Sequence, residues 1–230
     1  MKCEKLACSS AASKFLYGEE CKGNTKFLMV LHNAVDCEKY KFRLEKRESI
    51  RLELQIEDKV VIGHVGRFER QKNHRFLIDS FEHFYNFRKD AVLLLIGSGS
   101  LLNEMKQYVH DKNLDESVLF LGSRMNVWDY YQAMDQFWLP SLYEGLPMSA
   151  VEAQASGLPC LIADTVTKET GILEKTMFLK LEEGAEQWAR KANEFLMENN
   201  RERATKAVRN AGFDIEQESQ RLQEFYLDKG

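Results

Sequence analysis

The chain has 230 residues, of which 44% are hydrophobic and 30% are charged, and its formal net charge is −4 at pH 7. This size predicts one complete α/β domain with an appendage, and the negative charge argues against a nucleic-acid partner. No apolar run approaches the roughly 18 residues that a membrane-spanning helix needs. The five cysteines include no Cys-x-x-Cys pair, which favours reduced thiols in a cytosolic protein over a zinc site.

The first part of the chain predicts short elements. Residues 6–8 form an apolar strand-like piece, residues 9–18 a helix that begins at a Ser cap and ends at Gly18, and residues 27–31 a second strand. A strand without an earlier neighbour must join an existing sheet or pair with another chain. Asn33 and Asp36 then favour a turn, and residues 38–54 read as one helix.

Strands and helices alternate from residue 60 onwards. The continuous β-branched run at 60–65 is typical of a strand buried on both faces in a parallel sheet. We expect further strands at 91–96, 118–121, 137–139, 158–162 and 177–181, and helices at 74–87, 101–112, 126–134, 147–156 and 214–227. The alternation predicts right-handed βαβ units in a Rossmann-like, doubly wound parallel sheet, followed by C-terminal helices.

Four loops of this arrangement follow the carboxyl ends of strands. They are residues 66–73, 97–100, 122–126 and 140–148. Because ligands of open α/β sheets bind beyond the carboxyl ends of the strands, we expect the four loops to form one site.

Two carboxylates, Glu144 and Glu152, lie eight residues apart in the last of these regions. Pro147 is a natural first-turn residue, so Glu144 is expected before the helix and Glu152 on its wall. The N–H groups of Met148 and Ser149 then lie at the positive end of the helix, where anions are favoured. This stretch predicts a cradle for an anionic ligand.

Arg67 and Lys72 lie in the loop that follows the 60–65 strand. Two cations there suit a diphosphate, and since the chain has no Asp-x-Asp pair to hold a divalent metal, they would have to replace one. A solvated loop with ordinary ion pairs is the alternative interpretation. Gly97 opens a Gly-Ser-Gly turn after the 91–96 strand, which serves either a ligand or only tight backbone geometry.

Glu152 stands between Val151 and Ala153 on an otherwise apolar helix. A carboxylate there suits the hydroxyl groups of a ribose, as in dinucleotide-binding folds, and an exposed helical Glu is the alternative. His64 lies within a buried strand and His74 opens a helix. We predict that both are structural histidines with satisfied ring nitrogens rather than catalytic groups.

Several motifs together resemble the family 4 (group 1) retaining glycosyltransferases of GT-B fold, in particular the bacterial exopolysaccharide and capsule type. The Glu-x7-Glu spacing of Glu144 and Glu152 is the family's hallmark. The resemblance covers nearly the whole chain and also rests on residues 33–36, Gly66-Arg67 with 71–74, 95–99, 120–122 and 140–147.

The resemblance implies a role for each of these positions. Arg67 and Lys72 would hold the donor diphosphate, and the loop of Arg124 would touch the base through its backbone. Glu152 would take the ribose and Glu144 would face the transferred sugar as the catalytic residue. No metal or other cofactor is implied, and the donor substrate would be a UDP- or GDP-linked sugar.

The same resemblance predicts a division of the chain. Residues 1–25 would be the remnant of an N-terminal acceptor domain, 26–212 the C-terminal donor domain, and 213–230 a helix that crosses back to the first domain. A fragment, a relic and one half of a two-chain enzyme all fit this division. Expected partners are the nucleotide-sugar donor, a saccharide or lipid-linked acceptor, and a separate acceptor-domain chain. The expected location is cytoplasmic, with at most peripheral contact with the inner face of the membrane.

The leading functional hypothesis is therefore a hexosyltransferase donor domain that works with retention, though the chain alone would lack an acceptor site. A non-catalytic or partner-dependent nucleotide-sugar-binding module is the alternative, and a nucleotide-sugar 2-epimerase on the same fold is a third. An NAD-binding enzyme is disfavoured because no Gly-x-Gly-x-x-Gly follows the first strand.

Overall fold

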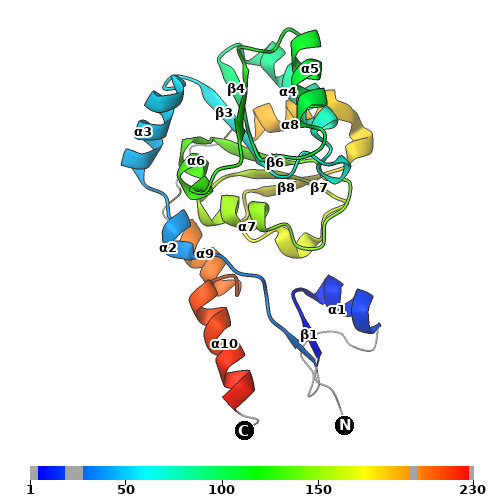
Figure 1. The fold of residues 1–230 in the computed structure, drawn as a ribbon, viewed down its shortest axis with the longest axis vertical. Helices are drawn as coiled ribbons and strands as arrows, with labels where there is room; N and C mark the ends of the chain where they lie inside the picture. Colours follow the sequence, from blue (N-terminus) through cyan, green and yellow to red (C-terminus); the bar gives the residue numbers. More distant parts are fainter. Residues whose placement is uncertain (1–4, 19–27, 197–200, 202, 228–230) are drawn as a thin grey trace.

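A computed structural model describes residues 5–18, 28–196, 201 and 203–227 (Figure 1). Cys3, Cys21 and the beginning of the strand expected at 27–31 lie outside the described residues. The cysteines within them, Cys8, Cys37 and Cys160, are free thiols, as the sequence predicts.

Six parallel strands form the central sheet, in the order β5-β4-β3-β6-β7-β8. Their bounds are β3 Val60–Val65, β4 Ala91–Ile96, β5 Val118–Gly122, β6 Gln136–Leu139, β7 Cys160–Ala163 and β8 Thr176–Leu179. Every residue of β4 and of β6 is buried, because helices cover both faces of the sheet. The predicted Rossmann-like, doubly wound parallel sheet is confirmed.

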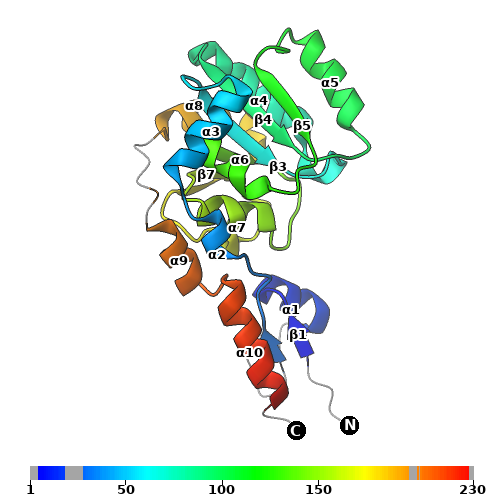
Figure 2. The same ribbon diagram turned by 60° about the vertical axis from the view of Figure 1, so that its left-hand side comes forward.

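The helices form two layers. One face carries α4 (His74–Phe87), α5 (Leu102–Asp111) and α8 (Gly184–Glu194), and α4 packs on both of the others. The opposite face carries α3 (Leu44–Leu54), α6 (Val127–Ala133) and α7 (Met148–Ala155), which lie together in the foreground of Figure 2. Short 3-10 turns occur at Arg70–Lys72, Lys168–Thr170 and Leu181–Glu183.

The strand order reverses between β3 and β6. The chain runs outward from β3 through β4 to β5 and then returns to place β6 on the other side of β3, with Gly63 opposite Phe137. The loops that follow β3 and β6 therefore diverge to opposite faces of the sheet at its carboxyl edge and leave a crevice between them. Such a switch point is where ligands of these folds bind.

One predicted helix, 38–54, is two helices. A short α2 (Cys37–Tyr40) begins at Asp36, whose carboxylate caps the N–H groups of Glu38 and Lys39, and α3 begins only at Leu44. Arg43 between them is extended, and its N–H donates to Gln132 Oε1 over 3.1 Å. This tertiary hydrogen bond to α6 interrupts a segment whose local pattern favours one continuous helix.

The N-terminal strands form a separate sheet. β1 (Lys5–Ala7) pairs in parallel with β2 (Leu28–Val30), next to α1 (Ser10–Tyr17). The predicted boundary at residue 26 assigned the second strand to the large domain, but its hydrogen bonds group it with β1. The division of the chain into 1–25, 26–212 and 213–230 otherwise stays a prediction.

The chain ends in α9 (Ala204–Asn210) and α10 (Ile215–Leu227). In Figures 1 and 2, α10 extends away from the six-stranded domain on the side of β1. Its Arg221 donates from Nη2 to the Val30 carbonyl over 3.1 Å, so the helix contacts the small sheet directly.

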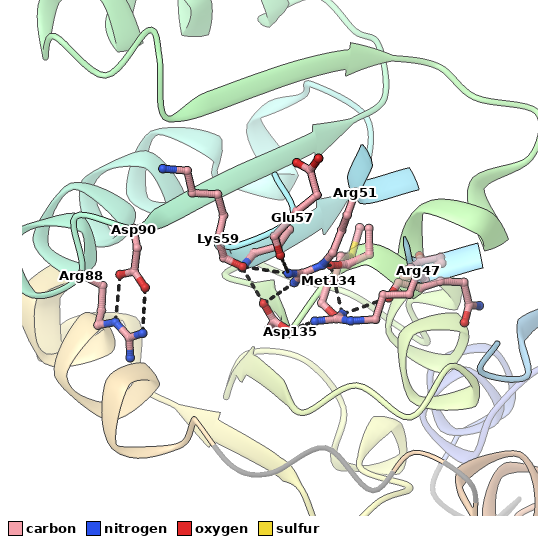
Figure 3. Close-up of polar contacts among 12 residues, drawn as sticks. Arg47, Arg51, Glu57, Lys59, Arg88, Asp90, Met134 and Asp135 are labelled. Atoms are coloured by element: carbon pink, nitrogen blue, oxygen red, sulfur yellow. Dashed lines mark hydrogen bonds and ion pairs between the residues drawn. The ribbon is translucent and has the colours of Figure 1, made fainter. Parts of the chain in front are cut away.

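A charged cluster fixes the amino edge of the large sheet, opposite the loops of interest (Figure 3). Asp135, just before β6, accepts from Arg47 Nη2 at 2.6 Å, from Arg51 Nη2 at 2.7 Å and from the Val61 N–H at 2.7 Å. Both arginines also donate to the Ala133 carbonyl at the end of α6. They thus satisfy carbonyl groups that the helix leaves free and stabilise the negative end of its dipole.

Candidate functional site

Backbone hydrogen bonds join the loops at the carboxyl edge of the sheet. The Gly97 N–H donates to Gly122 O over 2.9 Å, the Gly66 N–H to Ile96 O over 3.0 Å, and the Leu142 N–H to Gln71 O over 2.8 Å. The Gln71 side chain also donates to the Tyr143 carbonyl. The four loops therefore form one continuous surface, as the sequence predicts.

Position 97 leaves no room for a side chain. Its φ is +145°, and a Cβ added to it would lie 2.0 Å from the carbonyl oxygen of Gly66. The backbones of the loops after β3 and β4 touch at this point. Tight geometry accounts for Gly97, and its predicted role toward a ligand stays a prediction.

Lys72 and Glu144 meet across the switch point. Lys72 Nζ lies 2.5 Å from Glu144 Oε1, and the two side chains are only 14% and 10% exposed. The Ser141 hydroxyl donates to the same carboxylate oxygen over 3.0 Å. Lys72 therefore makes an ion pair, as in the alternative interpretation, but the pair is largely buried and not solvated, and the role of Lys72 toward a diphosphate stays a prediction.

Helix α7 points its first turn at this pair. Pro147 occupies the N-cap position, so Glu144 precedes the helix and Glu152 lies on it, as predicted. Helix geometry leaves the N–H groups of Met148 and Ser149 without intrahelical acceptors. A cavity of about 390 Å³ opens in front of them and is lined by these two residues together with Gly66, Arg67, Lys72, Glu144 and Glu152 among others.

A second cavity, of about 310 Å³, adjoins the first. Its walls include Arg67, Gly97, Arg124 and Glu152, so it shares Arg67 and Glu152 with the larger one. Arg67 and Arg124 are both exposed, and the Arg124 guanidinium lies 5.5 Å from the centre of the Tyr130 ring. All eight residues that the sequence singled out thus line one composite site, although what each of them binds stays a prediction.

Glu152 is not an ordinary surface glutamate. Burial raises the pKa of its carboxyl above the usual value, and hydrogen bonds from Tyr131 and Tyr40 oppose that rise. The Tyr131 hydroxyl lies 2.8 Å from Glu152 Oε2. The alternative of an exposed helical Glu is wrong, and the two tyrosines are site residues that sequence reasoning missed.

Neither tyrosine belongs to a loop that follows a strand, so the pattern that predicted the site did not include them. Tyr131 lies on the buried face of α6 and Tyr40 in the short helix α2. A signal was available in the sequence: a tyrosine hydroxyl at a core position of a helix needs a polar partner, and Tyr131 has one only because α6 packs near α7.

The two histidines are buried beneath the loop that follows β3. His64 Nδ1 pairs with Trp138 O at 2.8 Å, and His74 stacks on Phe68 with ring centres 4.0 Å apart. Three of their four ring nitrogens have no hydrogen-bond partner, so the prediction that both would be satisfied is wrong. Burial and the nearby Lys72 lower the pKa of His74 to about 4, and burial lowers that of His64. Both imidazoles are therefore neutral at pH 7.

In the part of the chain that the structure describes, no three or more His, Cys, Asp or Glu side chains gather closely enough to hold a metal ion. None of the helices among those residues is long and apolar enough to cross a bilayer.

Several curated bacterial proteins are similar in sequence to this chain. The chain is 36% identical over 185 residues to EpsF of Bacillus subtilis, which is provisionally named a glycosyltransferase; the match covers 80% of this chain and 48% of that one. It is 32% identical over 164 residues to an Escherichia coli UDP-Gal:α-D-GlcNAc-diphosphoundecaprenol α-1,3-galactosyltransferase, covering 70% of this chain and 42% of the enzyme. The chain thus spans about half the length of the curated relatives it matches.

Solved structures share the fold. The crystal structure of Anabaena Alr3699/HepE in complex with UDP superimposes with a TM-score of 0.78 at 20% identity, over 97% of this chain and 63% of that one. A glycosyltransferase from Rickettsia africae gives a TM-score of 0.81 at 16% identity, over 99% and 63% of the two chains. At these identities the likeness establishes the architecture alone.

The family follows from the sequence itself. The profile of the family described as "Glycosyl transferases group 1" matches residues 46–211, a segment that holds the whole composite site and most of the chain. The sheet with its reversed strand order, the paired Lys72 and Glu144, and this match agree. The chain belongs to the group 1 glycosyltransferases.

Proposed function

We propose that this chain is the donor-binding half of a retaining glycosyltransferase. It binds a nucleoside diphosphate sugar and delivers the hexose to a saccharide or lipid-linked acceptor. The observation that carries the proposal is the cluster at the switch point, where Arg67, the Lys72–Glu144 pair and the first turn of α7 surround a cavity of about 390 Å³. Positive groups with one acid beside them suit a sugar diphosphate.

The chemistry asked of these residues is stabilisation of a leaving group. When the bond between the anomeric carbon and the diphosphate oxygen breaks, negative charge grows on the diphosphate. In this proposal Arg67, Lys72 and the amides of Met148 and Ser149 stabilise that charge. Because these groups already line the cavity, no solvent has to reorient as the charge develops. Lys72 changes partner in part, from Glu144 to the diphosphate, which leaves the Glu144 carboxylate facing the sugar.

The relatives support the donor class. The Escherichia coli enzyme is named for transfer from UDP-Gal to a diphosphoundecaprenol-linked sugar, and the Anabaena protein was crystallised with UDP and with UDP-glucose. We therefore place uridine nucleotides first among the donors to test and guanosine nucleotides second. A lipid-linked acceptor would bring the protein to the membrane surface.

Calorimetric titration with UDP-glucose, UDP-galactose and GDP-mannose tests the proposal. We expect saturable binding of at least one of them, and Glu152→Gln and Lys72→Ala should each weaken it at least tenfold. Glu48→Gln, on the exposed face of α3, is the matched control and should bind as the parent chain does. Absence of binding by all three donors would overturn the proposal. Because the chain alone is expected to lack an acceptor site, binding without transfer that persists after an acceptor-domain chain is added would favour the non-catalytic module.

A further inference from the structure

The Glu152 carboxylate is held from behind by a tyrosine pair. The Tyr131 hydroxyl lies 2.8 Å from Glu152 Oε2 and 3.1 Å from the carbonyl oxygen of Ser149, one turn earlier on α7. Tyr131 is fully buried, and Tyr40, 8% exposed, packs with its ring centre 5.8 Å from that of Tyr131. The Tyr40 hydroxyl approaches the same carboxylate.

This support determines what Glu152 can offer a ligand. A glutamate side chain has three rotatable bonds and would sample several directions if nothing held its end. A hydrogen bond from a fully packed ring fixes one carboxylate oxygen and leaves the other for a second donor. Glu152 lies where three cavities meet, since it lines those of about 390, 310 and 340 Å³.

The charge state of Glu152 depends on the same contacts. Burial raises the pKa of its carboxyl, while the hydroxyl groups of Tyr131 and Tyr40 and the charge of Lys72 oppose that rise. The ionised carboxylate is an acceptor at both oxygens, whereas protonation turns one of them into a hydrogen-bond donor. Loss of a tyrosine hydroxyl would therefore cost orientation and would raise the pKa of the Glu152 carboxyl further.

We propose that Tyr131, assisted by Tyr40, is a positioning residue that aims the Glu152 carboxylate at the ribose hydroxyl groups of the nucleotide. The pair thereby makes the site select ribonucleotides over 2′-deoxyribonucleotides. The inference rests on the proposed function, since it assumes that a nucleotide occupies the composite site. The selection of the ribose then depends on Tyr40 of α2 and Tyr131 of α6 as well as on Glu152 of α7.

The test compares the affinities of ribo and deoxy nucleotides in matched variants. Dissociation constants of UDP and 2′-deoxy-UDP, and of GDP and 2′-deoxy-GDP, are measured by calorimetry for the parent chain, Tyr131→Phe, Tyr40→Phe and Glu152→Gln. Tyr108→Phe is the control, because it also removes a tyrosine hydroxyl from a carboxylate, that of Asp79, but on α5, outside the composite site.

In the parent chain we expect the preferred ribonucleotide to bind about tenfold more tightly than its deoxy form, as for one lost hydrogen bond to a charged group. Tyr131→Phe and Tyr40→Phe should reduce that ratio to about threefold or less while the deoxy affinity stays the same. The decline of ribonucleotide binding on acidification should begin at a higher pH in Tyr131→Phe. Tyr108→Phe should keep both the ratio and the pH profile of the parent chain.

The possible outcomes distinguish this inference from the proposed function on which it rests. If Glu152→Gln abolishes the preference and both tyrosine variants keep it, the positioning role is overturned and the donor site stands. If Tyr131→Phe weakens both forms equally, the tyrosine is only structural. If the parent chain binds no nucleotide, both proposals fail. Because Tyr131 is fully buried, the Tyr131→Phe variant could fail to fold. In that case the Tyr40→Phe variant tests the proposal.

Discussion

The Lys72 ammonium and the Glu144 carboxylate lie 2.5 Å apart, although the two residues are 72 positions apart in the chain. One follows β3 and the other follows β6, so the pair bridges the crevice at which the strand order reverses. Both side chains are largely buried and each is the other's counter-ion. The pair thus holds a cation and a carboxylate side by side at the switch point.

Breaking the Lys72–Glu144 ion pair should destabilise the folded chain. Lys72→Met should lower the free energy of unfolding by about 3 kcal/mol, because it leaves the Glu144 carboxylate buried without its counter-ion. Lys72→Met combined with Glu144→Gln should recover more than half of that loss, since no uncompensated charge remains. Urea unfolding followed by circular dichroism measures both. Lys46→Met, on the exposed side of α3, is the control, and equal loss in the single and double variants would contradict the pairing.

The cluster at the opposite edge of the sheet should affect stability without affecting the ligand. Asp135→Asn removes the charge that Arg47 and Arg51 share, and we expect a loss of about 3 kcal/mol in the free energy of unfolding. Nucleotide affinity should stay within about twofold of the parent value, because the composite site is at the other end of the strands. Asp58→Asn, exposed nearby, should change neither quantity. A variant that unfolds normally but binds tenfold more weakly would show that the two edges are coupled.

Gly97 tests how tightly the loops are joined. A Cβ at Gly97 would lie 2.0 Å from Gly66 O, so Gly97→Ala must separate the loops that carry Arg67 and the Gly-Ser-Gly turn. We expect a loss of about 2 kcal/mol or more in stability, from this clash together with the strain of φ +145°. Gly145→Ala is the matched comparison, because a Cβ there has open space and its φ is unremarkable. Equal melting temperatures for the two variants would mean that the close approach is not maintained in solution.

The buried histidines predict a stability that falls on acidification. The ordinary pKa of 6.5 applies to His74 in the unfolded chain, and burial lowers the folded value to about 4. Between these values the unfolded chain binds the extra proton, so stability is fully present above pH 6.5 and is lost as the pH falls toward 4. From pH 7 to pH 5 this one group should cost about 2 kcal/mol.

Replacement of the imidazole checks that account. His74→Phe should have a shallower decline of unfolding free energy between pH 7 and pH 5 than the parent chain, whereas His110→Gln, at an exposed position, should follow the parent. Urea midpoints at four or five pH values are sufficient. A parent chain and a His74→Phe variant with the same slope would mean that His74 does not stay neutral in the folded protein.

Local patterns were enough to predict the large sheet and the loops of the site. The β-branched run at 60–65 and the turn residues that follow each strand are local signals, and Pro147 indicated that a helix starts between Glu144 and Glu152. What the sequence could not show depends on contacts between distant segments. Arg43 interrupts a helix because of Gln132, and the strand at 28–30 pairs with β1 instead of joining the large sheet.

The same limit applies to the site. Both tyrosines that support Glu152 come from helices that meet α7 only in the folded chain. A tyrosine at a core position of a helix signals that its hydroxyl needs a polar partner, but the sequence does not show that Glu152 is that partner. For the two histidines the sequence pattern predicted only part of the result. Their positions in a strand and a helix predicted their burial, but the lack of partners for three ring nitrogens depends on the packing around them.

The most direct test of the account compares nucleoside diphosphates with the corresponding monophosphates. If Arg67, Lys72 and the first turn of α7 surround the second phosphate, as we propose, UDP or GDP should bind at least tenfold more tightly than UMP or GMP by calorimetry. Lys72→Ala should remove most of that difference while leaving the monophosphate affinity nearly unchanged. Equal affinity for diphosphate and monophosphate in the parent chain, or a difference that survives Lys72→Ala intact, would contradict the central claim that this crevice binds the donor diphosphate.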